Sequence, residues 1–228
     1  MSKKRKEPRK KDRDWQKLLS RAFIVVILLA CVIGFSLSFS FFSIFKTAEA
    51  GDYVTVYYTL YYEDDIPIIS SDPYLVQDAY AEGNQILAYT SQMQLQAGSL
   101  QSDRFIPVDA YQPVLGNVEY ALLNLEVDAM SSDVIGMHVN DVKQMDLEFG
   151  PSYSYNVTKE TFDNSEGLNF SDIEVGMLLF RNIDLSDDTG SDNTTKVVRP
   201  SVVIAKTNDT ATLRYGYSLA EIKVSDIT

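Results

Sequence analysis

Residues 52–62 read DYVTVYYTLYY, and this run of β-branched and aromatic residues predicts a strand that opens the main domain just after Gly51. A helix is expected over 117–135, where apolar residues recur near helical spacing, and another around 75–97 inside the polar stretch 72–104. Strands around few helices, without a βαβ rhythm, indicate an α+β or mostly β architecture. The other predicted strands are 66–69, 142–149, 176–181, 197–206, 210–216 and 220–227.

The N-terminal part differs sharply in charge from the rest of the chain. Residues 1–21 hold ten Lys/Arg and three Asp/Glu, and the 24 residues 22–45 carry no charge. A helix of that length can span a hydrocarbon core of about 30 Å, and basic residues before it stay in the cytoplasm. The pattern predicts a single-pass cell-membrane protein with a cytoplasmic tail 1–21, an uncleaved signal anchor 22–45 and an extracytoplasmic C-terminal part. The alternative is a signal peptide cleaved after Ala50.

The charge and the scarcity of Cys and His argue against several kinds of partner and active site. The whole chain of 228 residues has a net charge of −12, and residues 22–228 alone have −19, which argues against nucleic acid as a partner. Cys31 is the only cysteine and lies in an apolar run, so a disulfide framework or a thiolate zinc site is excluded. His138 is the only histidine and has no partner motif. We therefore expect no metal site and no small-molecule cofactor.

Four N-x-S/T sequons follow the apolar segment, and all lie in the part predicted to be outside the cell. Each is a short pattern, so chance occurrence in a Thr-rich chain stands beside glycosylation as an explanation. The candidate glycosylation sites are Asn156, Asn169, Asn193 and Asn208.

The order of motifs from residue 51 onward resembles that of FKBP-type peptidyl-prolyl cis-trans isomerases. Residues 51–59 (GDYVTVYYT) are similar to the family's opening strand G-D-x-V-x-V-x-Y-T, and 68–71 (IISS) stand where the family has F-D-S-S. The stretch 105–122 (FIPVDAYQPVLGNVEYAL) resembles the run from a pocket Phe to V-I-x-G-(W/F)-E-E-A-L. Residues 136–143 (GMHVNDVK) look like the G-M-x-V-G-E-K turn, and 149–153 (FGPSY) stand at the P-x-x-A-Y-G flap.

The later part resembles the archaeal and bacterial SlyD-like branch, which has a domain inserted in the flap. Residues 174–177 (EVGM) are similar to its E-G-M segment, and 199–215 look like its G-R-V-V-x-V hairpin. The resemblance implies an α+β fold: an FKBP-like antiparallel sheet wrapped on a helix, with a small β-rich inserted domain, preceded by one transmembrane helix. The FKBP-like domain would comprise 51–156 and 215–228, and the inserted domain 157–214.

The resemblance also implies a function, that of a peptidyl-prolyl isomerase and folding chaperone acting on exported proteins. Isomerisation of an X-Pro bond needs no nucleophile, metal or general base, because an apolar pocket and a donor can favour the twisted transition state. Partners would be proline-containing or unfolded polypeptides, and the membrane through residues 22–45. Implied catalytic residues are Tyr58, Phe105 and Tyr153, and implied substrate-pocket residues are Ile68, Ile69, Val114, Leu115 and Val118.

Three of these positions depart from the family pattern. Ile68 replaces a Phe, Ile69 replaces an Asp and Val118 replaces the Trp or Phe of the pocket floor. A pocket with fewer aromatic side chains buries less area against a prolyl ring and binds it less tightly. The departures favour an alternative in which the chain is a catalytically degenerate FKBP-like binding or scaffold module of the cell envelope. A third hypothesis is an accessory subunit of a membrane complex.

In the SlyD-like branch the inserted domain binds unfolded chains through exposed apolar residues, which implies a chaperone surface here. The competing explanation is that the same apolar residues form the core of a small β domain. The candidate chaperone residues are Leu168, Phe170, Met177 and Leu179.

Overall fold

The structure is a computed structural model that describes residues 11–43, 46–62, 66–165, 168–185 and 195–228. The chain divides into two compact units, Met1–Phe45 and Lys46–Thr228. In the first unit, α1 (Lys11–Ser43) is one continuous helix. Across the described residues, no helix is both long and apolar enough to cross a membrane. The segment 22–45, over which a transmembrane helix was expected, lies partly outside the described residues.

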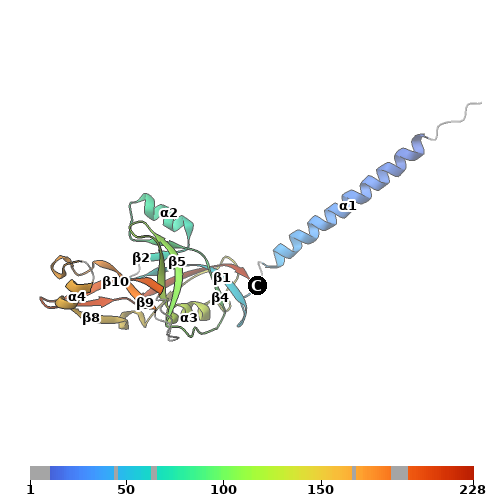
Figure 1. The fold of residues 1–228 in the computed structure, drawn as a ribbon. Coiled ribbons are helices and arrows are strands. Elements are labelled where there is room, and N and C mark those ends of the chain that lie inside the picture. Colours follow the sequence, from blue (N-terminus) through green and yellow to red (C-terminus); the bar gives the residue numbers. More distant parts are fainter. Residues whose placement is uncertain (1–10, 44–45, 63–65, 166–167, 186–194) are drawn as a thin grey trace, which may run out of the picture. The chain divides into compact units, whose positions relative to one another are not determined.

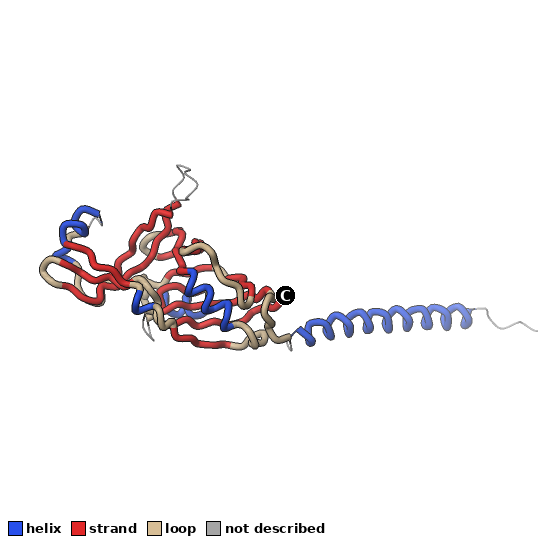
Figure 2. Tube along the Cα trace, turned by 90° about the horizontal axis from the view of Figure 1, so that it is seen from below, coloured by secondary structure: helices blue, strands red, loops and turns tan. Residues whose placement is uncertain are grey.

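In the second unit, every described strand joins one sheet that curls into a partial barrel (Figures 1 and 2). The strand β4 (Met93–Gln96) lies beside β1, and β9 (Leu178–Leu185) lies beside β10. The order of the remaining strands is β7 (Val142–Asp146), β12 (Leu219–Ile227), β1 (Tyr53–Tyr61), β2 (Pro67–Ser70), β3 (Ala88–Thr90), β5 (Phe105–Gln112), β6 (Gly116–Leu123), β10 (Thr195–Lys206), β11 (Thr210–Arg214) and β8 (Ser154–Thr158).

The helices of this unit are short. They are α2 (Pro73–Ala81), α3 (Asn124–Asp133) and α4 (Lys159–Ser165), with 3-10 turns η1 (Gly150–Ser152) and η2 (Phe170–Asp172). Two helix predictions need correction. The helix expected over 117–135 begins only at Asn124, because residues 116–123 pair with β5 as a strand. The helix expected around 75–97 ends at Ala81, and β3 and β4 follow it.

The predicted fold class, an α+β fold with an FKBP-like antiparallel sheet wrapped on a helix, is wrong. The second unit is mostly β, and its long curled sheet also contains parallel pairs, β2 with β3 and β6 with β10. The error arose in β6, where apolar residues satisfy both a helical and an alternating pattern. Val118, Tyr120 and Leu122 alternate along the strand, and pairing with β5 decides the conformation.

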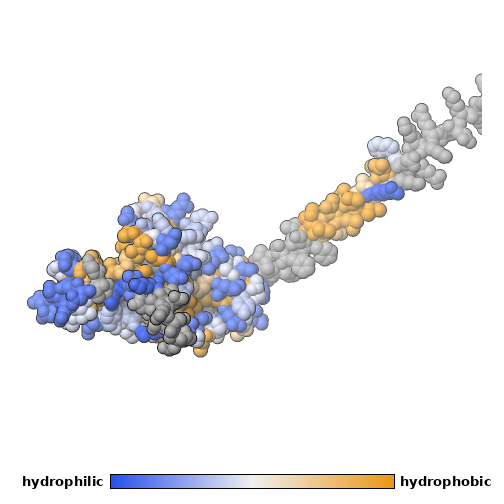
Figure 3. Space-filling view, viewed as in Figure 1, coloured by the Kyte–Doolittle hydropathy of each residue, from blue (hydrophilic) through white to orange (hydrophobic). Residues whose placement is uncertain are grey.

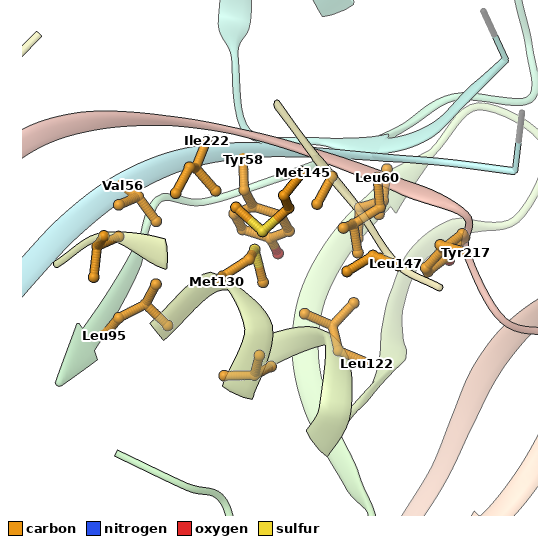
Figure 4. Packing of buried hydrophobic residues seen from close by; sticks show 14 of the residues in the cluster. Val56, Tyr58, Leu60, Leu95, Leu122, Met130, Met145, Leu147, Tyr217 and Ile222 are labelled. Carbon is orange, nitrogen blue, oxygen red and sulfur yellow. The ribbon is translucent and has the colours of Figure 1, made fainter. Parts of the chain in front are cut away.

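The main hydrophobic core lies between the strands around β1 and the helix α3. Figure 4 shows Tyr58 of β1 beside Met130 of α3, with Ile222 of β12 and Met145 of β7 close by. These side chains are buried, and Leu122 and Tyr217 extend the cluster toward β6. Burial of such apolar area is the main stabilising contribution to this unit.

A second, smaller core lies at the end of the unit that carries α4. Phe162 of α4 and Phe170 of η2 meet edge to face, with ring centroids 5.9 Å apart. The other buried members come from β8, β9, β10 and β11 or from the loop after η2, namely Val157, Ile173, Leu179, Val203, Ala211 and Leu213. The outer surface of the unit is largely hydrophilic in Figure 3, with apolar atoms gathered beneath α2 in that view.

Candidate functional site

The implied isomerase residues do not line one common pocket. Tyr58 is buried in the main core, where burial raises the pKa of its hydroxyl to about 12. Phe105 lines a cleft with Tyr215, whereas Ile68 lines an apolar hollow with Tyr62. Tyr153 contacts Tyr215, at 5.6 Å between ring centroids. Of the three implied catalytic residues, Phe105 and Tyr153 are thus brought near each other through Tyr215, whereas Tyr58 shares the main core with Ile68 and Ile69.

The remaining pocket candidates are also dispersed. Ile69 is fully buried on β2, and Val118 lines a separate open hollow together with Tyr89 and Tyr111. Val114 and Leu115 are exposed in the turn between β5 and β6, where both backbone amides donate to the Gln112 side chain at 2.7 Å. A tight hairpin turn therefore occupies the position at which the resemblance places a pocket base.

The candidate chaperone residues divide into two kinds. Phe170 and Leu179 belong to the second hydrophobic core and are buried. Leu168 and Met177 are exposed. Of the four sequons, Asn193 lies outside the described residues. Asn156 accepts a hydrogen bond from Thr212 Oγ1 at 2.7 Å and Asn169 donates one to Asp172 at 3.0 Å, while Asn208 is exposed.

The cleft that contains Phe105 combines aromatic and cationic side chains. Its volume is about 410 Å³, and it is lined by the start of β5, by residues of β8, β9 and β10, and by Tyr215 just after β11. Residues 46–228 contain four arginines, and three of them, Arg104, Arg181 and Arg199, line this cleft. Its described lining includes no Asp or Glu. The cleft therefore gathers most of the few arginines of this unit.

Two of the arginines are direct cross-strand neighbours. Arg181 of β9 lies opposite Arg199 of β10, and opposed like charges destabilise a sheet unless they are compensated. Arg199 is compensated, since its Nη2 lies 2.5 Å from Glu126 Oε1. Burial alone would lower the pKa of Arg199, but the attraction of Glu126 outweighs it and the pKa is raised. Burial lowers the pKa of Arg181, because desolvation disfavours the cation.

The aromatic rings connect the other two arginines. Arg104 Nη2 donates to the hydroxyl of Tyr215 at 3.3 Å, and Arg181 Nη1 donates to the hydroxyl of Tyr155. The rings of Tyr155 and Tyr215 lie 5.9 Å apart, and the Arg104 guanidinium lies 5.2 Å from the ring centre of Phe105. Arg104, Tyr215, Tyr155 and Arg181 thus form a continuous row along the cleft.

The cleft runs beside β9, which lies at the edge of the described sheet. Three consecutive residues of β9 line it, from Arg181 to Ile183. Neighbouring side chains on a strand point to opposite faces, so a hollow that touches all three lies against the backbone of β9. Within the described part of the chain, β9 pairs only with β10, and its other edge has no strand partner.

Sequence reasoning did not find this cleft. Its residues come from positions 104–105, 155, 181–183, 199–201 and 215, and no motif connects them. One available signal was the scarcity of arginine in residues 46–228. Comparison with known proteins gives no guide here, since no family model matches the chain and no curated protein is similar to it.

Proposed function

We propose that residues 46–228 form a polypeptide-binding module that holds an extended client segment in the cleft. The observation that carries this proposal is the position of an aromatic cleft beside β9, one edge of which has no strand partner among the described residues. An extended chain can satisfy its backbone groups on such an edge while its side chains enter the adjoining pocket. Proline-containing or unfolded polypeptides offer both kinds of group.

The size and lining of the cleft support a ligand with bulky side chains. About 410 Å³ falls within the range of roughly 300–1,000 Å³ that is usual for binding pockets. Phe105, Tyr155 and Tyr215 offer rigid aromatic area, and aromatic residues and arginine dominate the energetics of protein interfaces. The cleft therefore offers residue types that commonly dominate binding to a polypeptide.

Peptidyl-prolyl isomerase activity stays a prediction from the resemblance, as does action on exported proteins. A prolyl pocket would need Tyr58, Phe105 and Tyr153 around one hollow, but Tyr58 lies in the main core. Binding without catalysis, as in a scaffold or a holding chaperone, is the function that this arrangement favours.

The test uses the full chain and a permanently unfolded polypeptide, reduced and carboxymethylated lactalbumin. We expect saturable binding, at least tenfold weaker in the cleft variants Phe105→Ala and Tyr215→Ala. Tyr111→Ala removes an exposed tyrosine of β5 outside the cleft and should bind like the unaltered chain. Folded protein that binds no unfolded polypeptide would overturn the proposal.

A second measurement with the same preparation addresses catalysis. Refolding of a protein limited by a prolyl bond should proceed at the same rate with and without the full chain. Acceleration that disappears in Phe105→Ala would instead support an isomerase, and it would contradict the non-catalytic proposal.

A further inference from the structure

A second hollow lies on the exposed face of the sheet, over β3, β5 and β6. Its volume is about 500 Å³, and it shares no lining residue with the cleft that contains Phe105. Because β3 pairs with β5 and β5 pairs with β6, three neighbouring strands form its floor. The polypeptide-binding function proposed for the cleft does not account for this hollow.

Two tyrosine side chains form one part of its lining. Tyr89 of β3 lies directly opposite Tyr111 of β5. The two tyrosines are 40% and 46% exposed, whereas the strand neighbours Ala88, Thr90 and Ala110 are buried. Alternate residues of a strand share a face, so both rings stand on the exposed face of the sheet. The hollow therefore offers a pair of adjacent rings to a ligand.

Polar side chains complete the lining on the same face. Tyr111 lies opposite Asn117 of β6, and Asp109 lies opposite Glu119 two residues along the same strands. Asp109, Asn117 and Glu119 are exposed, and their side chains make no hydrogen bond or ion pair with any other described residue. A strand spacing of about 4.8 Å and a rise of about 3.3 Å per residue make this face about 10 Å by 7 Å.

We propose that this hollow binds a neutral oligosaccharide whose pyranose rings carry equatorial hydroxyls. Such a ring is flat and has an apolar C–H face on each side, which packs against the rings of Tyr89 and Tyr111. Its hydroxyls donate hydrogen bonds to the carboxylates of Asp109 and Glu119 and accept one from the amide of Asn117. Ring faces, acceptors and a donor all obtain a partner in this way.

The two carboxylates determine which sugars bind. Asp109 and Glu119 are opposed like charges, and hydroxyl donors near them lessen their repulsion. An acidic sugar would bring a further negative charge to a chain whose residues 22–228 have a net charge of −19. A compact ammonium group would pair with the carboxylates but would leave most of the ring area and the Asn117 amide without a partner. The lining as a whole therefore favours a neutral sugar.

The experiment measures binding of cellohexaose, a neutral chain of β-1,4-linked glucose, to the full chain by isothermal titration calorimetry. We expect saturable binding that changes little in 1 M NaCl, because salt screens interactions between charges and the sugar has none. The matched probe is the same hexamer oxidised to a carboxylate at each C6. It should bind about tenfold more weakly at low salt, and the difference should shrink in 1 M NaCl.

Variants locate the site. Tyr111→Ala removes one ring and should weaken cellohexaose binding about tenfold, whereas Tyr111→Phe keeps the ring and should retain most of the affinity. Glu119→Gln removes one charge but keeps an acceptor, so the oxidised hexamer should approach the neutral one in affinity. Tyr74→Ala removes an exposed tyrosine of α2 outside the hollow and should bind like the unaltered chain. Circular dichroism and thermal unfolding of each variant verify that it is folded.

The cleft and the hollow are distinguished by a reciprocal pair of variants. Phe105→Ala should keep cellohexaose binding and lose binding of unfolded lactalbumin, and Tyr111→Ala should do the reverse. Folded chain that binds no cellohexaose, or binding that Tyr111→Ala leaves unchanged, would overturn the proposal. A lysine tetrapeptide that binds more tightly than cellohexaose, and is lost in Tyr111→Ala, would also overturn it, since the hollow would then be a cation site.

Discussion

The guanidinium of Arg199 and the carboxylate of Glu126 form a fully buried ion pair, with Nη2 and Oε1 2.5 Å apart. Arg199 lies on β10, and Glu126 lies in the first turn of α3, where its Oε2 also accepts the backbone amide of Leu123 at 2.8 Å. Arg199 donates further to the carbonyl oxygens of Ala121 and Tyr215. One pair therefore joins the cleft wall, the start of α3 and the end of β6.

Removal of the carboxylate is expected to destabilise the second unit. Glu126→Gln leaves a buried guanidinium charge without its counter-ion, which costs about 3–5 kcal/mol of the free energy of unfolding. The double variant Glu126→Gln/Arg199→Met removes both charges and should lose less than the sum of the single variants. Urea unfolding of the full chain, followed by circular dichroism, measures each value. Additive losses would contradict the pairing.

Alkaline pH should weaken the main core through Tyr58. Burial raises the pKa of its hydroxyl to about 12, above the ordinary value of about 10. The neutral phenol is thus favoured in the folded state, and its stabilisation is present below pH 10 and lost as the pH rises toward 12. The expected loss from this group is about 3 kcal/mol.

The measurement is the free energy of unfolding at several pH values between 9 and 12. Tyr58→Phe has no hydroxyl to ionise at this position, so its free energy of unfolding should fall correspondingly less over this range. Tyr89→Phe, at an exposed tyrosine, serves as the control and should follow the unaltered chain. Identical pH curves for Tyr58→Phe and the control would rule out this role for Tyr58.

A close backbone approach makes Gly150 irreplaceable. A Cβ at this position would lie 1.8 Å from the carbonyl oxygen of Tyr217, and a backbone atom cannot move aside cheaply. Gly150→Ala should therefore displace η1 from the segment before β12 and destabilise the unit by more than about 4 kcal/mol, beyond the usual range for one substitution. Ser152→Ala, exposed in the same turn, should change stability by less than about 0.5 kcal/mol. Similar melting temperatures for both variants would refute the close approach.

The segment predicted to be a chaperone surface contains a core residue, Phe170, and an exposed residue, Leu168. Phe170→Ala empties a site packed against Phe162 and should cost about 3–5 kcal/mol. Leu168→Ala alters an exposed side chain and should cost less than about 0.5 kcal/mol. Chemical unfolding of both variants measures the difference. A small loss for Phe170→Ala would show that this residue is not in a core.

Several strands were predictable because their side chains encode the pattern locally. The run 52–62 and the alternating segment 220–227 are confirmed as β1 and β12, which pair with each other. Residues 117–123 were misassigned as helix, since their apolar spacing fits both periodicities and only the partner strand β5 decides between them. Motif matching to a family had no access to this pairing, and the predicted fold class failed there.

The amino-acid sequence by itself determined where β-branched and aromatic runs become strands, how acidic the body of the chain is, and how few arginines it has. Only the tertiary structure decided that Tyr58 enters the core and that Arg104, Arg181 and Arg199 gather at one cleft. The physical reason is the separation along the sequence over which each effect acts. Strand propensity depends on neighbouring residues, whereas burial and charge pairing join residues as distant as Glu126 and Arg199.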